Sequence, residues 1–590
     1  MSDQSSGRRP PGKGGFGKRP GGAGGGKRPP GDRPFGPRPQ GDRPQGDRPQ
    51  GERRFGPRPE GDRPRGPRPQ GDGPRSDGPR GERPFNNRPK ADGVQGERRF
   101  GPRPEGDRPR GPRPEGDRPR GPRPEGDRPR GPRPEGDRPR GPRPQGDRLD
   151  GAPRRMKPGA AANPRVLAVD LIGQVLRGRR PLDDAFAGHP GLKPLDLRDR
   201  AFVRALTAAV LRHLGLIDAV IAKLVREPIK PRDAVAEDIL RLGLAQLLIL
   251  ETPPHAAVSA TVALTVELNM AHMTGFVNAL LRRFIDEHET LLASIDRARA
   301  AVPAWLWKSW EATYGLETTQ AIAAGLSGEA PLDLTLKDPA TAAEWAEKLG
   351  AEILPTGSLR VQETHGRVDA LLGFSQGVWW VQDAGAALPA KLLGNIAGQR
   401  VVDLCAAPGG KTMQLAAAGA KVTALDRSAQ RLRRVTENLA RVGLTAETVA
   451  DDAAFYRAPR PFDAVLLDAP CSATGTARRH PDVLWLKQPG DIDTLIIAQD
   501  RLLDAAAKMI STGGTLVYCV CSLEPEEGPE RIARFLARDR RFIRVPVRAA
   551  EVGGMAEFIT PQGDLRTLPS HLADKGGIDG FYAARLRRVS

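Results

Sequence analysis

The chain has 590 residues, a length that predicts two to four domains, and it carries a formal net charge of +20. Residues 1–158 hold 41 Lys and Arg against 22 Asp and Glu, whereas the rest of the chain holds 51 against 50. A uniformly basic nucleic-acid-binding protein is therefore excluded, and any RNA surface beyond residue 158 must be a local patch.

Secreted and membrane proteins are also disfavoured. The N-terminus lacks the apolar stretch of a signal peptide and is too acidic for a transit peptide. The apolar run ILRLGLAQLLIL contains Arg241 and Gln246 and is too short to span a bilayer. All four cysteines lie in the last third of the chain, without the spacing of a disulfide framework. We expect a cytoplasmic protein with no membrane association, and we expect it to be monomeric.

Residues 1–158 consist almost entirely of Gly, Pro, Arg, Gln and acids, and they repeat the ten-residue unit EGDRPRGPRP. This composition cannot bury enough apolar surface to offset chain entropy, so we expect disorder. Gly does not recur at every third position, which excludes a collagen helix. Two interpretations remain open for this tail: a solvated spacer, or a flexible polyelectrolyte that holds RNA through its excess of arginine.

Apolar residues recur at near-helical spacing through residues 159–294. The segment NPRVLAVDLIGQVLRG, which starts at Asn163, places its branched apolar side chains on one broad face. Three later segments repeat the pattern, and none shows the alternation of a strand. The sequence therefore predicts an all-helical domain.

The next segment, residues 295–375, mixes one helix that contains three Trp with two short strands, LDLTLKD and SLRVQE. It predicts a small α/β connector that docks RNA. Beyond it, strands alternate with helical runs, and strands are expected at 378–382, 400–404, 421–426, 447–450, 463–467 and 514–519. This alternation predicts an α/β domain with a doubly wound, Rossmann-like sheet over residues 376–590. The final GFYAARLRRV predicts a strand that returns along one edge.

The loop DLCAAPGGKT, from Asp403 to Thr412, ends like a nucleotide-binding P-loop. A P-loop requires Gly where this loop has Cys405, and Pro408 lacks the N–H that a phosphate cradle uses. An RNA-linked ATPase is therefore the weaker alternative. Binding of S-adenosylhomocysteine rather than ATP would separate the two.

A different ligand fits the same loop. Gly409 and Gly410 let a ligand approach the backbone, and the N-terminus of the helix that follows favours a carboxylate. Asp426 ends the next strand, where an acid can accept both hydroxyls of a ribose. Asp452 follows the strand after that and is placed to meet an adenine amino group. Carboxylate, ribose and adenine in this order describe S-adenosylmethionine.

Two cysteines follow two strands: Cys471 in LLDAPCSATG and Cys521 in LVYCVCSLEPEEG. Neighbouring strand ends in a wound sheet open on one crevice, so both thiols can face one substrate. A thiolate suits methylation of a pyrimidine at carbon 5, because its addition at carbon 6 makes carbon 5 nucleophilic. Asp468 is placed to stabilise the charge that develops on the ring. Either cysteine can equally be a small buried apolar residue, and the residues alone leave the nucleophile open. No metal site is expected, because Cys519 and Cys521 are one residue apart and no paired ligand spacing recurs.

These segments resemble the signatures of the Sun-type RNA cytosine-5 methyltransferases, and within that family the enzymes that modify bacterial small-subunit rRNA. The matching segments are DLCAAPGGKT, LLDAPCSATG with RRHPD, and LVYCVCSLEPEE. The helical part, HAAVSATVALTVELN with GFVNALLRRF, is similar to the NusB-like domain of those enzymes. The resemblance covers residues 160–590. It implies S-adenosylmethionine-dependent methylation of RNA cytosine at carbon 5.

The resemblance also implies roles for single residues. Cys521 corresponds to the nucleophile and Cys471 to the residue that aids product release, with Asp468 beside them. The implied cofactor-binding positions are Cys405, Ala406, Ala407, Pro408, Gly409, Gly410, Lys411, Asp426, Asp452 and Asp468. The chain departs from the family at Val520, where Thr is usual before the nucleophile, and at Cys519, where a small residue is common.

Arg478, Arg479 and His480 adjoin the catalytic motif, and we expect them to grip RNA phosphates around an extruded base. The alternative is a solvated loop that caps the following helix. The expected partner is RNA, most of all 16S rRNA of the small subunit, with tRNA as an alternative. The rival class is a non-catalytic RNA-binding ribosome-assembly factor, against which the intact cysteines and cofactor loop argue.

Overall fold

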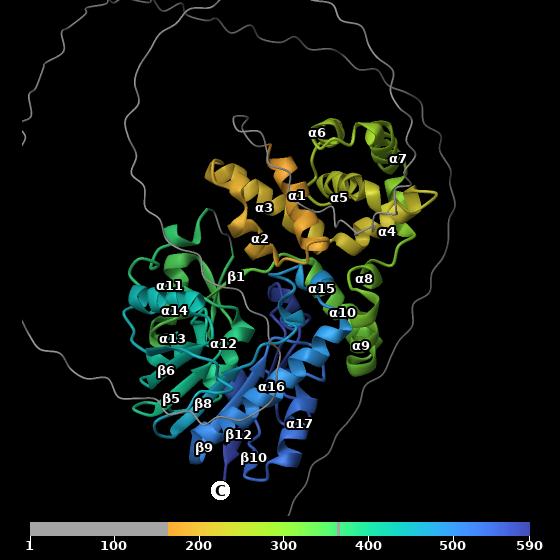
Figure 1. Ribbon diagram of the computed structural model, residues 1–590. Helices are drawn as coiled ribbons and strands as arrows, with labels where there is room; N and C mark the ends of the chain where they lie inside the picture. Colours follow the sequence, from red (N-terminus) through yellow and green to blue (C-terminus); the bar gives the residue numbers. More distant parts are fainter. Residues whose placement is uncertain (1–162, 363–365) are drawn as a thin grey trace, which may run out of the picture. The chain divides into compact units, whose positions relative to one another are not determined.

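The computed structural model describes residues 163–362 and 366–590 (Figure 1). The repeat of residues 1–158, with its expected disorder and its RNA contact, lies outside these residues. Within them, helices form the N-terminal part, a small antiparallel sheet follows, and a larger mixed sheet forms the C-terminal part.

The N-terminal part is all helical, as the periodicity predicted. Its helices are α1 (Pro164–Leu176), α2 (Leu182–Gly188), α3 (Leu197–Arg212), α4 (Leu214–Leu224), α5 (Ala234–Leu248), α6 (Pro254–Glu267) and α7 (Thr274–Ala293). Helix α1 begins after Asn163 because that side chain accepts the N–H of Arg165 and Pro164 occupies the first turn. Helix α5 is central and packs against α1, α3, α4, α6 and α7.

No single helix among the described residues is long and apolar enough to cross a membrane. Helices α3 and α4 meet the criteria of length and composition only as a pair, and that pair is bent by 70°.

A small four-stranded sheet follows three helices. The elements are α8 (Arg297–Ala300), α9 (Ala304–Tyr314), α10 (Leu316–Ser327), β1 (Leu332–Leu336), α11 (Ala342–Leu349), β2 (Ala351–Ile353), β3 (Leu359–Val361) and β4 (Trp379–Val381). The strand order is β2-β3-β1-β4, and every pair is antiparallel. The strand expected at 378–382 therefore belongs to this sheet and not to the doubly wound one, because Trp379 packs into the apolar cluster of the small sheet. The connector accordingly extends past residue 375.

The large sheet contains eight strands. They are β5 (Arg400–Leu404), β6 (Lys421–Asp426), β7 (Glu447–Ala450), β8 (Phe462–Asp468), β9 (Ile510–Val520), β10 (Phe542–Arg544), β11 (Leu565–Thr567) and β12 (Phe581–Arg588). The order is β10-β12-β9-β8-β5-β6-β7, with β11 paired to β12. Strands β5 to β9 are mutually parallel, whereas β12 is antiparallel to β9. The last strand does not form the edge that the sequence predicted, because β10, which sequence reasoning missed, pairs outside it.

Helices cover both faces of the large sheet, which confirms the doubly wound α/β fold (Figure 1). The helices in this part of the chain are α12 (Ala384–Lys391), α13 (Gly410–Ala417), α14 (Ala429–Val442), α15 (Val483–Leu486), α16 (Pro489–Met509) and α17 (Pro529–Arg538), of which α15 packs against the helical part. Helices α16 and α17 pack on one face, and α12, α13 and α14 pack on the other. Successive strand residues point to opposite faces, so Val402 and Leu404 lie in one cluster and Val401 lies in the other.

The helical part contacts the segment that follows β8. The indole N–H of Trp485 in α15 donates to the carbonyl of Leu211 at 2.9 Å, and the N–H of Leu182 donates to Asp482 at 2.9 Å. Gly215 of α4 lies against this joint. A Cβ at Gly215 would stand 1.8 Å from the carbonyl oxygen of Ala300 and 3.0 Å from the Trp485 ring.

Gly215→Ala should therefore destabilise the protein by about 1–3 kcal/mol, because the backbone oxygen it meets cannot rotate away. Gly275→Ala in α7 is the matched control, since a Cβ there has no heavy atom within 4 Å. It should change the free energy of unfolding by no more than about 0.5 kcal/mol. Urea denaturation of both variants measures the difference, and equal stability of the two would contradict this packing.

Candidate active site

Two residues of the loop between β5 and α13 have positive φ angles. The chain turns through Cys405 with a φ of 64°, and Gly409 precedes α13 with a φ of 105°. A Cβ at Gly409 would lie 3.1 Å from Val435 of α14. Both the backbone conformation and the packing therefore require glycine at this position. The loop lies at the carboxyl edge of the sheet, because it follows the end of a parallel strand.

Two acids lie at the ends of the next two parallel strands. Asp426 ends β6 with 2% of its surface exposed, and its carboxylate accepts the N–H of Ala407 at 3.3 Å. Arg431 of α14 lies 3.2 Å from the same carboxylate. Asp452 follows β7, is exposed and accepts the N–H of Ala454 at 2.9 Å. Asp426 therefore orders the loop of the preceding strand, whereas Asp452 caps its own turn.

This donor set fits S-adenosylmethionine. Strands β5, β6 and β7 are parallel neighbours, so the loop, Asp426 and Asp452 follow one another along one edge of the sheet. A helix N-terminus suits a carboxylate, and carboxylate oxygens suit hydroxyl and amino donors. The residues from Cys405 to Lys411 and the two acids would hold the cofactor. Burial raises the pKa of Cys405 to about 12, so its thiol stays neutral in this loop.

Lys411 forms an ion pair inside the site. Its Nζ lies 2.8 Å from Asp468 at the end of β8 and 5.0 Å from the centre of the Phe581 ring. Burial is the strongest single influence and lowers the pKa of Lys411. The charge of Asp468, its hydrogen bond and the charges of Cys519 and Cys521 together nevertheless raise that pKa overall. Asp468 also accepts a hydrogen bond from the thiol of Cys519 at 3.4 Å. Asp468 therefore has a fixed positive neighbour at the strand end.

The two cysteines that follow β8 and β9 meet. The strands pair in parallel with Asp468 opposite Cys519, and the Sγ atoms of Cys471 and Cys521 lie 3.5 Å apart. The hydrogen bond to Cys521, followed by burial, raises the pKa of Cys471 well above its ordinary value. Cys471 is therefore a neutral thiol that is able to donate to the sulfur of Cys521. Their contact was expected from the strand order, while their separate roles stay predictions.

Sequence reasoning missed several buried acids around this site, among them Glu524 and Asp403. Glu524 accepts hydrogen bonds from Trp310 and Ser309 of α9, both at 2.8 Å, and burial raises its pKa to about 7. Asp403 accepts the hydroxyl proton of Thr412 at 2.6 Å, and burial likewise raises its pKa to about 7. An acid inside an apolar strand was a signal for Asp403. No such signal marked Glu524, because that residue lies in an acidic segment typical of an exposed loop.

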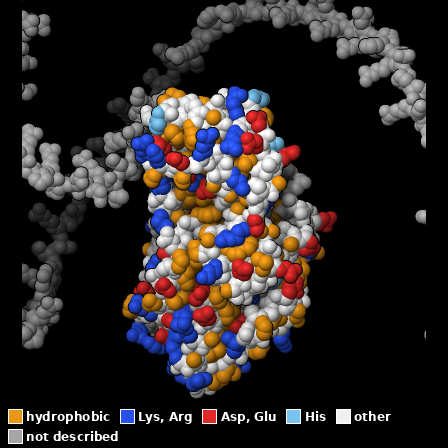
Figure 2. Space-filling view, turned by 90° about the vertical axis from the view of Figure 1, so that its right-hand side faces the viewer, with side chains coloured by type: hydrophobic (Ala, Val, Ile, Leu, Met, Phe, Trp, Pro, Cys, Tyr) orange, Lys and Arg blue, Asp and Glu red, His pale blue; other side chains and the backbone are white. Residues whose placement is uncertain are grey.

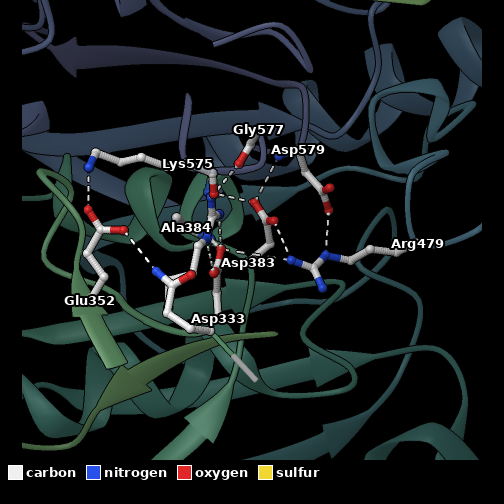
Figure 3. A network of polar contacts seen from close by, with 11 residues as sticks. Asp333, Glu352, Asp383, Ala384, Arg479, Lys575, Gly577 and Asp579 are labelled. Carbon is white, nitrogen blue, oxygen red and sulfur yellow. Dashed lines mark hydrogen bonds and ion pairs between the residues drawn. The ribbon is translucent and has the colours of Figure 1, made fainter. Parts of the chain in front are cut away.

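Arg478 and Arg479, expected to grip RNA phosphates, lie mostly inside the protein. Arg478 is 1% exposed. Arg479 pairs with Asp383 at 2.6 Å and with Asp579 at 3.2 Å (Figure 3). Asp383 starts α12 and Asp579 precedes β12, so Arg479 joins two distant segments to the loop after Cys471. Neither arginine offers a free guanidinium to a phosphate in this structure, which corrects the expectation.

His480 faces the helical part. Its Nδ1 lies 3.5 Å from Asp183 of α2, and the hydrogen bond to Asp183 raises the pKa of the imidazole. The contact with Asp183 thus gives His480 a role in joining the two parts of the protein that does not involve RNA. On the face shown in Figure 2, positive and negative side chains are interspersed, so charge alone singles out no RNA surface there.

Two family models match the sequence: the 16S rRNA methyltransferase RsmB/F model over residues 390–587, and the NusB family model over residues 162–286. The chain is 38% identical to ribosomal RNA small subunit methyltransferase B of Pseudomonas putida, over 72% of this chain and 99% of that protein. It is 35% identical to the protein of the same name from Escherichia coli K12, over 72% and 98%. The solved structure of PH0851 shares the fold, with a TM-score of 0.55 at 22% identity over 72% of this chain and 99% of that chain.

Glu524→Gln tests whether protonation of Glu524, in the loop that follows Cys521, changes the stability of the protein with pH. Its folded pKa of about 7 lies above the reference value of 4.5. The stability that it contributes is therefore present below pH 4.5 and is lost as the pH rises through 7. Glutamine cannot ionise, so the free energy of unfolding of the variant, relative to that of the wild type, should rise by up to about 3 kcal/mol between pH 4.5 and pH 7.

Urea denaturation at pH 5 and pH 8 measures that gain. Glu530→Gln is the control, because Glu530 lies exposed in the first turn of α17. A stability difference between wild type and Glu524→Gln that stays constant with pH would contradict the linkage.

Proposed function

This chain belongs to the 16S rRNA methyltransferase RsmB/F family, and from that membership we propose that it methylates carbon 5 of a cytosine in small-subunit rRNA. The relatives named ribosomal RNA small subunit methyltransferase B support the substrate, since the alignment spans nearly their whole length. The observation that carries the chemistry is the contact of two thiols, 3.5 Å apart, beside Asp468 at the strand ends.

S-adenosylmethionine, when bound, supplies a methyl group on a positively charged sulfur. The Cys521 thiolate forms a bond to carbon 6 of the cytosine, and the electron pair of the carbon 5–carbon 6 double bond becomes available at carbon 5. After carbon 5 has gained its substituent, it loses its proton to a base. The double bond then re-forms, and the electron pair of the carbon–sulfur bond returns to Cys521. The Cys521 thiolate is thereby regenerated.

The neighbouring residues suit this sequence of steps. Asp468, paired with Lys411 at 2.8 Å, is proposed to face the ring nitrogen where charge develops. Cys471 is proposed to assist release of the product, because as a neutral thiol it can donate to the departing sulfur of Cys521. Val520, where the family usually has Thr, lies in the apolar cluster under the sheet, so its side chain belongs to the core.

We also propose the division of labour among the segments. The helical domain 159–294 and the connector would dock RNA, the doubly wound domain that follows β4 would carry out the chemistry, and the tail would raise the local RNA concentration. Two alternatives remain: tRNA as the substrate, and a non-catalytic assembly factor that retains the fold. The second is disfavoured, because both cysteines are present with their sulfurs in contact and Asp426 still holds the cofactor loop through the N–H of Ala407.

The cysteine assignment predicts opposite results for two variants. Cys471→Ala should accumulate a covalent protein–RNA adduct with small-subunit rRNA and S-adenosylmethionine, because the bond to carbon 6 forms but breaks slowly. Cys521→Ala should form no adduct and no 5-methylcytosine, because the attacking sulfur is absent. Denaturing gel electrophoresis of labelled RNA detects the adduct.

The double variant Cys471→Ala with Cys521→Ala is the control and should form none. An adduct with Cys521→Ala alone would reverse the two assignments. Full methylation by Cys521→Ala would reject covalent catalysis by this residue.

A further inference from the structure

Each cysteine of the pair is followed by a fully buried serine. The hydroxyl oxygens of Ser472 and Ser522 lie 2.9 Å apart. In addition, the N–H of Gly475 donates to the carbonyl of Cys521 at 3.0 Å. The loops that carry Cys471 and Cys521 are therefore tied to each other by side-chain and backbone hydrogen bonds close to the thiols.

Glu527 anchors this tie. Its carboxylate is fully buried and accepts the N–H of Ser472 at 2.9 Å and the Ser472 hydroxyl proton at 2.5 Å. Gln499 of α16 donates to the same carboxylate at 2.9 Å and, at an equal distance, to the carbonyl of Pro470. Because Ser472 gives its one hydroxyl proton to Glu527, the hydroxyl of Ser522 must donate to Ser472.

The donors to Glu527 are a backbone amide, a hydroxyl and a side-chain amide, all of them neutral. Such partners stabilise a buried carboxylate without cancelling its charge, so its field reaches neighbouring groups. Cys471 is one of them. Its raised pKa results first from the hydrogen bond to Cys521 and from burial, and then from the charges of Cys521 and Glu527.

We propose that Glu527, acting through Ser472 and Ser522, is a positioning residue that holds the Cys471 sulfur in hydrogen-bond contact with the Cys521 sulfur. The inference rests on the proposed function, in which the two thiols have different tasks. Glu527 fixes the geometry of the two loops and keeps Cys471 in its thiol form. A thiol in that position can donate to Cys521, whereas a second thiolate would repel it.

Among the charges that raise the pKa of Cys471, that of Glu527 comes from outside the cysteine pair. Tyr518 of β9 is fully buried, and burial raises its pKa so that it stays neutral. Lys411 and Asp468 neutralise each other at 2.8 Å. Within its own loop, a backbone N–H acts in the opposite direction and lowers the pKa of Cys471. Removal of the Glu527 charge should therefore make Cys471 easier to deprotonate.

The test is Glu527→Gln in the full-length protein. Iodoacetamide alkylation across a pH series, followed by mass spectrometry of each cysteine, should show the Cys471 midpoint shifted to lower pH. In methyl transfer to rRNA, kcat should fall while KM for RNA stays unchanged. Glu530→Gln removes an exposed acid three residues away and should move neither readout. An unmoved Cys471 midpoint in Glu527→Gln would overturn the proposal.

Ser522→Ala keeps the Glu527 carboxylate but removes the hydrogen bond between Ser472 and Ser522. It therefore serves as the second test if Glu527→Gln does not fold. It should slow diamide-driven disulfide formation between Cys471 and Cys521 about tenfold, and an unchanged rate would also overturn the proposal. Alkylation and disulfide formation need no RNA. A wild-type protein with these thiol properties but inactive on rRNA would therefore reject the proposed function alone.

Discussion

The parallel pairing of β8 with β9 is the constraint on which the rest of the site depends. It sets Asp468 opposite Cys519, so the chain leaves both strands at one edge and turns into Cys471 and Cys521. The sulfurs can then meet at 3.5 Å without a disulfide bond, and Asp468 stands beside them. A slip of one residue in this register would turn the side chains of one strand to the opposite face and separate these groups.

Buried charges join the small sheet to the catalytic domain. Arg360 of β3 forms two hydrogen bonds to Asp333 of β1, at 2.7 and 2.8 Å, and Asp333 also accepts the N–H of Ala384 in α12 (Figure 3). Arg479 continues this network to Asp579. Desolvation offsets much of the attraction in such pairs, so their contribution lies mainly in holding segments in one arrangement. The loop after Cys471 is therefore positioned from two sides, by this network and by the Cys521 loop.

The sequence predicted the fold class and most strands, because apolar periodicity and short connections are local signals. The sequence prediction placed β4 in the wrong sheet and missed β10. Both errors concern long-range strand pairing, which periodicity does not encode. Among the site residues, the strand-end rule brought Cys471 and Cys521 together correctly. Arg478 and Arg479 resembled an RNA contact by charge alone, and only the structure reveals that Arg478 is buried and that Arg479 pairs with two buried acids. Glu524 and Glu527 were missed for the same reason, since acids in a loop are normally exposed.

Methylation of a small-subunit rRNA cytosine through Cys521 can be tested in cells. The measurement is bisulfite sequencing of rRNA from cells that lack the gene, complemented with wild type or with Cys521→Ala. Methylation through Cys521 predicts one cytosine in small-subunit rRNA that is protected with the wild-type gene and unprotected with the variant or without the gene. Equal protection of every cytosine in all three would rule out this role for Cys521.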